Sequence, residues 1–281
     1  MKVAVITRHA ICNYGSFLQS YALQKAIEKL GNEAVIIDYI REDEEYHKRS
    51  NIALKKSKRW NKNLLMRTIY KVSRYPETVL MERKFAQFRK KHLNMTKMYT
   101  SMQELENDKP KADIYCTGSD QVWGPISLDN YDPAYCLDFT NDEDVKISYA
   151  ASFGKTKFEG DTMSYFANAL KKYKYLSVRE NSATEIISGM GIDKVEQVLD
   201  PTLLLNSDEW SKLIEKEITG KYVLVYQIHS NPELDRYAEE FAKKVNLPLL
   251  RVSFYLHQIS RSGKLIYLPT IGQFLSYIKN A

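Results

Sequence analysis

The chain has 281 residues, 44% of them hydrophobic and 27% charged, so it is long and apolar enough to bury one or two sizeable cores. No apolar run approaches the roughly 20 residues that cross a bilayer, and Met1–Ile6 is typical of a first core strand rather than of a signal peptide. The cysteines, at positions 12, 116 and 136, are widely spaced and predict neither a disulfide framework nor a thiolate metal site. We therefore expect a cytoplasmic protein.

The net charge of +6 is concentrated in one segment. Between His47 and His92 the sequence has fifteen Lys or Arg residues against two acids, whereas the rest of the chain has a balance of −7. The simpler interpretation is a helical insert with a solvated basic face. The alternative is a binding surface for an anionic membrane or a phosphorylated acceptor, which would place the protein peripherally at the inner face of the cell membrane. No nucleic-acid recognition motif accompanies the charge, so no nucleic-acid partner is expected.

Apolar runs alternate with helical patterns over residues 1–220, which we expect to form an N-terminal domain. A strand at Lys2–Thr7 precedes a helix in which Ser16 and Gln19 have capping-box spacing, and a strand at Glu33–Tyr39 follows. This strand–helix–strand order predicts a parallel sheet. Further strands are expected at Asp113–Thr117, Lys146–Ala150, Tyr175–Val178 and Val195–Leu199, and helices at Asn63–Val72, Glu77–His92, Thr162–Lys172 and Ser182–Ser188.

Residues 221–281 repeat the α/β pattern on a smaller scale. Strands are expected at Val223–Ile228, Leu249–Ser253 and Lys264–Leu268, with a helix at Pro232–Val245. A last amphipathic helix begins at Thr270, and its apolar face holds Ile271, Phe274, Leu275 and Ile278. No strand follows that helix, so we expect an incomplete second domain in which this face is partly exposed.

Three loops should carry binding residues, because ligands of doubly wound sheets bind at the carboxyl ends of the strands. The loop after the first strand contains Asn13 and Gly15, directly before a helix N-terminus that attracts anions. The loop after Asp113–Thr117 offers small polar side chains and an aromatic surface, and the loop after Lys146–Ala150 is a small-residue turn. The candidates in these two loops are Ser119, Asp120, Trp123, Ser152 and Gly154.

Arg179 is the sharpest local feature of the sequence. It leaves a buried strand, and Ser182 with Glu185 has capping-box spacing just beyond it, so a guanidinium is expected beside a helix N-terminus. Both features attract anions. The alternative is a structural salt bridge between Arg179 and Glu180.

Five motifs together resemble the polysaccharide pyruvyl transferase family. They occur in the family's order over about 200 residues, and the resemblance extends over essentially the whole chain. It implies two Rossmann-like domains in an arrangement similar to the GT-B glycosyltransferases. The motifs are Asn13-Tyr14-Gly15-Ser16-Phe17-Leu18-Gln19, Gly118-Ser119-Asp120-Gln121-Val122-Trp123, Ser148-Tyr149-Ala150-Ala151-Ser152-Phe153-Gly154, Ser177-Val178-Arg179-Glu180 and Asp200-Pro201-Thr202-Leu203-Leu204-Leu205.

The resemblance implies transfer of pyruvate from phosphoenolpyruvate to sugar hydroxyls of a cell-surface polysaccharide precursor, free or lipid-linked. Phosphoenolpyruvate is a co-substrate, and neither a cofactor nor a metal is expected. Arg179 matches the arginine of the family's Ser-x-Arg-Glu motif and is the expected donor-binding residue, since guanidinium groups bind phosphate and carboxylate bidentately. The loop residues Asn13, Gly15, Ser119, Asp120 and Ser152 would line the acceptor side, with Trp123 and Gly154 beside them.

The sequence departs from the family pattern at its C-terminal end. Family members continue with a strand and a Ser-Phe-His-Gly-like turn whose histidine is the expected proton-transfer group, and that segment would lie beyond Ala281. His9 and His229 are the alternatives among the residues present, although a solvated or structurally paired imidazole is the simpler interpretation of each. We therefore expect the chain as written not to turn over.

Two other functions stay open from the sequence. One is a glycosyltransferase of similar architecture that uses a nucleotide sugar. The other is a non-catalytic module that binds anionic glycolipid precursors through the basic segment and the acceptor loops. Binding of phosphoenolpyruvate, and not of nucleotide sugars, would separate the first from a pyruvyl transferase.

Overall fold

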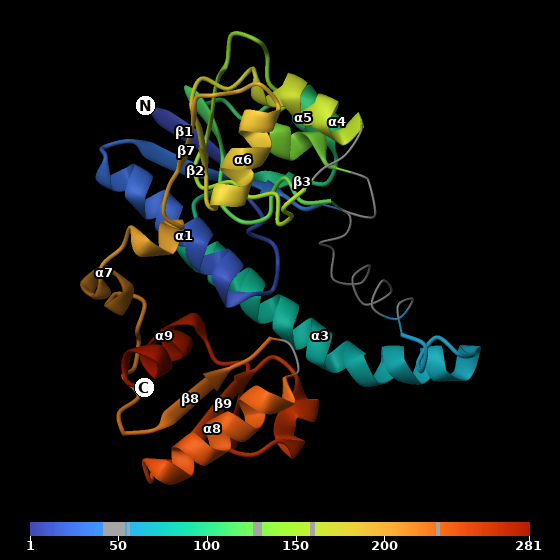
Figure 1. Ribbon diagram of the computed structural model, residues 1–281, viewed down its shortest axis with the longest axis vertical. Coiled ribbons are helices and arrows are strands. Elements are labelled where there is room, and N and C mark those ends of the chain that lie inside the picture. The colour runs from blue at the N-terminus through green and yellow to red at the C-terminus, as the bar shows by residue number, and fades with distance from the viewer. Residues whose placement is uncertain (42–53, 55–56, 126–130, 158–160, 229–230) are drawn as a thin grey trace. The chain divides into compact units, whose positions relative to one another are not determined.

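The chain folds into two compact α/β units. The computed structural model describes residues 1–41, 54, 57–125, 131–157, 161–228 and 231–281 (Figure 1). Unit 1 contains Met1–Thr68 and Phe85–Leu205, and unit 2 contains Ile69–Lys84 and Asn206–Ala281. The strands of both units pair in parallel, as the sequence predicts.

Unit 1 is built on a parallel sheet with the strand order of a Rossmann fold. Five strands pair in the order β3-β2-β1-β4-β5, and β6 pairs with β7. Bridges from Ile147 to Tyr175 and from Ala151 to Val178 connect β5 to β6, which extends the order to 3-2-1-4-5-6-7. The strands are β1 (Lys2–Ile6), β2 (Glu33–Tyr39), β3 (Met95–Tyr99), β4 (Ile114–Thr117), β5 (Val145–Ser148), β6 (Leu176–Val178) and β7 (Val195–Gln197).

The central strand β1 shows why the apolar runs of the sequence were good predictors. Val3, Ala4, Val5 and Ile6 are all buried, although successive side chains of a strand point to opposite faces. A strand covered on both faces must be apolar without alternation, as in doubly wound proteins. The edge strand β3 lacks this signal, because four of its five side chains are partly or fully exposed, and the sequence analysis missed it.

The helices of unit 1 are α1 (Tyr14–Lys29), α4 (Met102–Asn107), α5 (Asp161–Leu170) and α6 (Asn181–Gly189), with 3₁₀ turns η1 (Pro133–Cys136) and η2 (Pro201–Leu203). Two predicted capping boxes were wrong. Helix α1 begins three residues earlier than that pattern requires, because Asn13 is its N-cap and its Oδ1 accepts from the Gly15 N–H at 2.7 Å. The N-cap of α6 is Glu180, which makes no side-chain cap bond.

Helix α3 (Leu64–His92) runs without a break through Pro76, so the prediction of two helices was wrong. A proline removes one helix hydrogen bond and usually breaks the helix. Hydrogen bonds on either side of it support the backbone here, because Thr78 Oγ1 donates to the Arg74 carbonyl at 2.6 Å and Ser73 Oγ donates to the Tyr70 carbonyl at 3.0 Å. The part of the basic segment at 47–53 and 55–56 lies outside the described residues.

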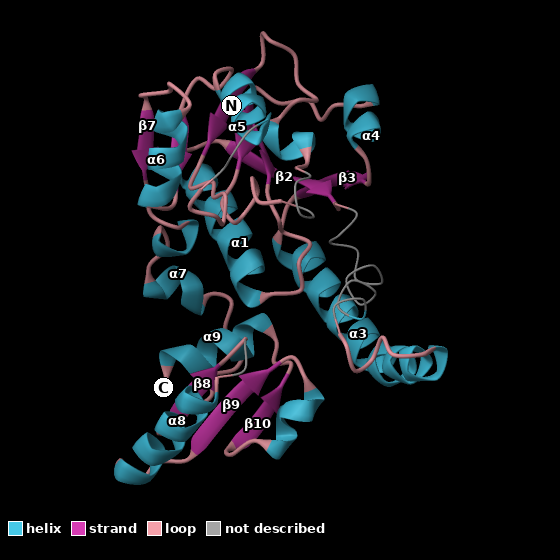
Figure 2. Ribbon diagram, turned by 45° about the vertical axis from the view of Figure 1, so that its right-hand side comes forward, coloured by secondary structure: helices cyan, strands magenta, loops and turns pink. Residues whose placement is uncertain are grey.

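Unit 2 contains a parallel sheet of order β10-β9-β8, with α8 packed against β8 and β9 (Figure 2). This is the order of the first half of a Rossmann fold. Its elements are α7 (Ser207–Ser211), β8 (Val223–Tyr226), α8 (Pro232–Lys244), β9 (Leu249–Ser253), η3 (Leu256–Ser260), β10 (Lys264–Tyr267) and α9 (Ile271–Lys279).

The middle of α3 is part of unit 2 through specific contacts. The Lys84 ammonium donates to the Leu268 carbonyl at 2.8 Å, and the Glu77 carboxylate accepts from the Leu256 N–H at 2.6 Å. The Arg74 guanidinium lies 5.0 Å from the centre of the Tyr255 ring. A segment from the first third of the chain therefore completes the unit formed by its end.

The apolar face of α9 is mostly covered, which corrects the expectation of an exposed face. Ile271 and Phe274 are 2% and 4% exposed, and the Phe274 ring meets Tyr226 edge-on at 5.1 Å. Only Ile278, at 50%, is substantially exposed. The cover comes from β8 and from the segment after α7, so the helix needs no further strand to bury these two side chains.

Gly272 should be the least replaceable glycine of unit 2. A Cβ atom at this position would lie 2.4 Å from the Leu213 carbonyl oxygen, which is backbone and cannot rotate away. We expect Gly272→Ala to lower the free energy of unfolding by about 1–3 kcal/mol, the usual cost of overpacking. Chemical denaturation measures this.

Gly189→Ala is the matched control, since it adds the same methyl to the last residue of α6, where the nearest atom is 3.8 Å away. There the better helix propensity of alanine should leave stability unchanged or raise it by up to about 1 kcal/mol. Equal effects of the two substitutions would show that α9 does not pack closely on the segment after α7.

Candidate functional site

The candidate site lies where the strand order of unit 1 reverses, at the carboxyl ends of β1 and β4. In such sheets the connections on the two sides of this point leave a crevice for ligands. The loops after these two strands are joined directly: Thr7 Oγ1 donates to the Ser119 carbonyl at 2.7 Å, and Ser16 Oγ donates to Asp120 Oδ2 at 2.8 Å.

Ser16 and Gln19 hold this junction from helix α1. The Gln19 amide donates to Thr7 Oγ1 at 2.9 Å and to Ser20 Oγ at 2.8 Å, and all four side chains are buried. The polar residues that resembled a cap in the sequence therefore bind the two loops to the helix instead. These hydrogen bonds hold the two loops in position on the helix.

Asn13 and Gly15 begin α1 beside the same junction. The Asn13 carboxamide oxygen caps the Gly15 N–H, which leaves this side chain oriented by the helix N-terminus. Gly118, the first residue after β4, is required by close packing, since a Cβ there would lie 3.0 Å from Thr7 Cβ and 3.2 Å from a methyl of Leu23.

Asp120 has a strained backbone. Its φ of 80° lies in the left-handed region that non-glycine residues rarely adopt. Its carboxylate accepts from the Gln121 N–H at 2.8 Å as well as from Ser16, while its carbonyl accepts from the Ser152 N–H at 3.1 Å. Strain of this kind persists only where surrounding contacts enforce it, and such residues are enriched at functional sites.

Ser152 and Gly154 form the adjoining turn after β5. The buried Ser152 hydroxyl donates to Glu180 Oε1 at 2.6 Å and accepts from the Gly154 N–H at 3.0 Å. Gly154 has a φ of 62°, and a Cβ on it would lie 2.6 Å from the Gln121 side chain. The turn after β5 is thus fitted against the loop after β4.

Arg179 lies at the end of β6 between two carboxylates. Its Nη1 is 3.1 Å from Asp200 Oδ2, and its Nε is 3.6 Å from Glu180 Oε2. The guanidinium remains 29% exposed, so it can reach a ligand from this position. The salt bridge with Glu180 that the sequence analysis gave as an alternative role for Arg179 is present, and Asp200 is a second and closer partner.

The sequence analysis did not single out Asp200 as a site residue. Its Oδ2 also accepts from Ser119 Oγ at 3.4 Å, and its Oδ1 accepts from the Thr202 N–H and hydroxyl at 3.0 and 2.7 Å. Burial, with a further contribution from the Asp200 charge, raises the pKa of Tyr149, so this neighbouring phenol stays protonated. Asp200 follows β7, and the same strand-end rule that found the other loops would have found it.

Trp123 is part of the core, so its predicted role as a stacking surface was wrong. The side chain is 1% exposed, its Nε1 donates to the Tyr135 carbonyl at 3.1 Å, and its ring centre lies 5.1 Å from that of Phe153. An indole with a satisfied N–H packs well in a core. Its place after a strand made it look like a ligand-binding residue.

His9 is structurally paired, and its imidazole is fully buried. Nε2 lies 2.9 Å from Asp38 Oδ1 and Nδ1 lies 3.1 Å from the Thr7 carbonyl oxygen, so both ring nitrogens are engaged. His229 lies outside the described residues. Among the residues that the structure describes, no cluster of three or more His, Cys, Asp or Glu side chains could hold a metal ion.

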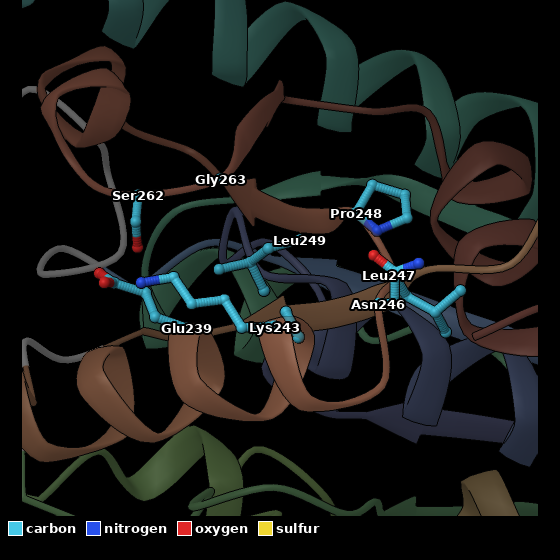
Figure 3. Close-up of a pocket in the computed structure, with 9 residues that line it drawn as sticks. Glu239, Lys243, Asn246, Leu247, Pro248, Leu249, Ser262 and Gly263 are labelled. Carbon is cyan, nitrogen blue, oxygen red and sulfur yellow. The ribbon is translucent and has the colours of Figure 1, made fainter.

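A separate pocket of about 550 Å³ lies in unit 2, between α8 and the starts of β9 and β10. Glu239 and Lys243 extend into it from α8, with Ser262 across from them (Figure 3). This is the amino edge of the small sheet, opposite to the edge at which doubly wound proteins bind ligands.

The sequence profile of the family described as polysaccharide pyruvyl transferase matches residues 13–281 of the chain. The chain belongs to this family. A comparison with curated proteins finds no match. The match to the polysaccharide pyruvyl transferase profile begins at Asn13, so it includes every candidate site residue described above except Thr7 and His9.

The edge that this pyruvyl transferase family member presents is rich in hydrogen-bonding groups of two kinds. Asp120, Glu180 and Asp200 supply partly exposed carboxylate oxygens, whereas the three serines that donate to them, Ser16, Ser119 and Ser152, are buried. Such groups suit the hydroxyls of a sugar, which both donate and accept. Arg179 adds a guanidinium suited to phosphate or carboxylate. The carboxylates of this edge can accept hydrogen bonds from hydroxyl groups, and the guanidinium can donate to an anion.

The contact between Gly154 and Gln121 can be tested by substitution. Gly154→Ala should destabilise unit 1 more than Gly191→Ala does, because both positions have positive φ, but only the first places a methyl against Gln121. Each substitution should lower the free energy of unfolding by about 1–2 kcal/mol, because alanine is disfavoured in the left-handed conformation. Thermal or urea unfolding of the two variants gives the difference.

Gln121→Ala provides the decisive control, because the atoms that would clash at Gly154 are its Cγ, Cδ and Oε1. In that background Gly154→Ala should cost no more than Gly191→Ala. A persistent difference would mean that the two loops are not packed as described.

Proposed function

We propose that the chain provides the donor and acceptor sites for transfer of a pyruvyl group from phosphoenolpyruvate to hydroxyls of a cell-surface polysaccharide precursor. Membership of the polysaccharide pyruvyl transferase family carries this proposal, and the carboxyl edge of unit 1 supports it. As the sequence resemblance implies, the two units would be Rossmann-like domains of a GT-B-like protein.

The residue that would bind the phosphoenolpyruvate donor is Arg179. Phosphoenolpyruvate carries a phosphate and a carboxylate, and a guanidinium binds either through two parallel hydrogen bonds. Arg179 is partly exposed at a strand end beside the N-terminus of α6, where the helix dipole also favours an anion. Asp200 and Glu180 orient its guanidinium from two sides and leave it in a fixed position before the donor arrives.

The proposed acceptor groups surround the junction of the β1 and β4 loops. Asp120 and Ser16 already share a hydrogen bond there, and the partly exposed Asp120 carboxylate can accept from a sugar hydroxyl. Accepting this hydrogen bond would raise the nucleophilicity of the hydroxyl oxygen. The negative charge around the junction favours binding of a neutral sugar and disfavours binding of an anion. The anionic donor would therefore bind at Arg179.

Formation of a ketal needs two proton uptakes, by the methylene carbon and by the departing phosphate, and two proton losses, one from each sugar hydroxyl. A general acid protonates the methylene carbon of phosphoenolpyruvate, the carbon that bears the phosphate becomes cationic, and the sugar oxygen bonds to it while losing its proton. The carbon–oxygen bond to phosphate then breaks and releases inorganic phosphate. A second hydroxyl of the sugar closes the ketal at the same carbon. Arg179 would balance the charge on phosphate as it leaves.

Binding of phosphoenolpyruvate to the full chain tests the donor role. Arg179→Ala should weaken the affinity by roughly 10- to 100-fold, because a hydrogen bond to a charged group contributes about 1.5–3 kcal/mol. The affinity of Arg179→Lys should lie between those of the wild type and of Arg179→Ala, because lysine keeps the positive charge but lacks the planar guanidinium. Titration calorimetry measures these affinities, and Arg236→Ala, which removes an exposed arginine of α8, is the control.

Asp120→Asn should separate the acceptor side from the donor side. We expect it to leave phosphoenolpyruvate affinity within about twofold and to weaken the binding of glycan acceptors by at least about tenfold, because a hydrogen bond to a charged group contributes about 1.5–3 kcal/mol. Tight binding of nucleotide sugars without phosphoenolpyruvate binding would contradict the proposal and favour a glycosyltransferase. Unchanged phosphoenolpyruvate binding in Arg179→Ala would reduce Arg179 to a structural ion pair.

A further inference from the structure

The N-terminal part of α3 exposes a row of large apolar side chains. These six residues are between 41% and 79% exposed, and we refer to them as the α3 apolar face: Leu64, Leu65, Ile69, Val72, Tyr75 and Leu80. The sequence analysis recognised only the charge of this segment. Contiguous apolar surface of this kind usually marks an interaction site.

The face is distinct from the side by which α3 packs on the protein. Leu65, Ile69, Val72 and Leu80 follow one another at intervals that return to one side of the helix, and the exposed Pro76 lies in the same row. The side chains that α3 buries, Thr78, Met81 and Phe85, lie on the opposite side. The apolar face is therefore not a displaced part of the core.

The charges around this face are almost entirely positive. Arg67 lies one helical turn from Leu64 and Lys71 one turn from Tyr75, and both are exposed. Arg83 and Lys90 are exposed further along the helix. The helix has two acids, Glu77 and Glu82, and the Glu77 side chain is 9% exposed and paired with Arg74. The surface thus combines exposed apolar groups with cationic groups that have long flexible stems.

The combination fits the surface of an anionic bilayer better than a protein partner. An amphipathic helix that lies in the membrane interface buries its apolar face at the boundary of headgroups and acyl chains while Lys and Arg reach to lipid phosphates. The half-buried Trp60, whose ring stacks with the Arg59 guanidinium at 5.1 Å, precedes the helix and adds an aromatic group of the type enriched at that depth. Within the described part of the chain, no helix is long and apolar enough to cross a bilayer.

We propose that the α3 apolar face, with Arg67 and Lys71 beside it, binds the surface of membranes that contain anionic lipids. The apolar side chains enter the headgroup region, and the basic side chains bind lipid phosphates. This inference is independent of the proposed transfer reaction, so either can fail without the other.

Sedimentation of the full chain with vesicles tests the proposal. Vesicles of phosphatidylcholine mixed with phosphatidylglycerol should bind the protein, and vesicles of phosphatidylcholine alone should bind it at least about tenfold more weakly. Raising the salt concentration should weaken binding to the anionic vesicles, because exposed charges are screened within about 8 Å at physiological ionic strength.

Two pairs of substitutions separate the apolar from the electrostatic contribution. Ile69→Asp with Val72→Asp should lower binding to anionic vesicles at least about thirtyfold. Its control is Leu30→Asp with Met98→Asp, which changes two exposed apolar residues outside α3. Arg67→Gln with Lys71→Gln should lower binding by about tenfold or more. Its control is Lys243→Gln with Lys244→Gln at the end of α8.

Circular dichroism establishes whether the variants are folded. If the double variant does not fold, the single substitution Val72→Asp, at a position that is 67% exposed, replaces it. Absence of wild-type binding to anionic vesicles would overturn the proposal. Undiminished vesicle binding by Ile69→Asp with Val72→Asp and by the single variant Val72→Asp would also overturn it. A dimer in solution that Ile69→Asp with Val72→Asp dissolves, without vesicle binding by the wild type, would overturn it in favour of a second copy of the chain.

Discussion

The carboxylate of Asp200 joins three segments that are distant in sequence. It accepts from Ser119 after β4, pairs with Arg179 at the end of β6, and closes the turn at Thr202. Each contact alone is modest, because the residues are partly exposed and solvent screens their charges. Together they align the loops of the carboxyl edge, so that one carboxylate sets the positions of the guanidinium and of the neighbouring serine.

The carboxyl edge of unit 1 separates two kinds of polar chemistry over a short distance. The junction of the first and fourth strands offers hydroxyls and carboxylates, whereas the end of the sixth strand offers a guanidinium held between two acids. This arrangement follows from the topology, since parallel strands deliver all their loops to one edge. The proposed acceptor and the proposed anionic donor would therefore bind through different groups of the same edge.

The sequence predicted the buried strands well and the polar details poorly, for a common reason. A run such as Val3–Ile6 can be explained only by a doubly covered strand, whereas Ser16 and Gln19 fit several local patterns and their true partners are distant in sequence. Trp123 failed in the same way, because burial of an indole is decided by its tertiary neighbours. Arg179 lies at a strand end as predicted, paired with Glu180 and Asp200, and its role in donor binding stays a prediction.

The division of α3 between the two units has a consequence for the order of folding. The chain passes between the units after Thr68, after Lys84 and after Leu205, so residues 69–84 belong to a unit whose other part is translated last. At 5–20 residues per second, the time between synthesis of residues 69–84 and synthesis of the rest of unit 2 is on the order of ten seconds. During that time the partners of Glu77 and Lys84 do not yet exist, and a nascent chain exposes both faces of this helix to chaperones and membranes alike.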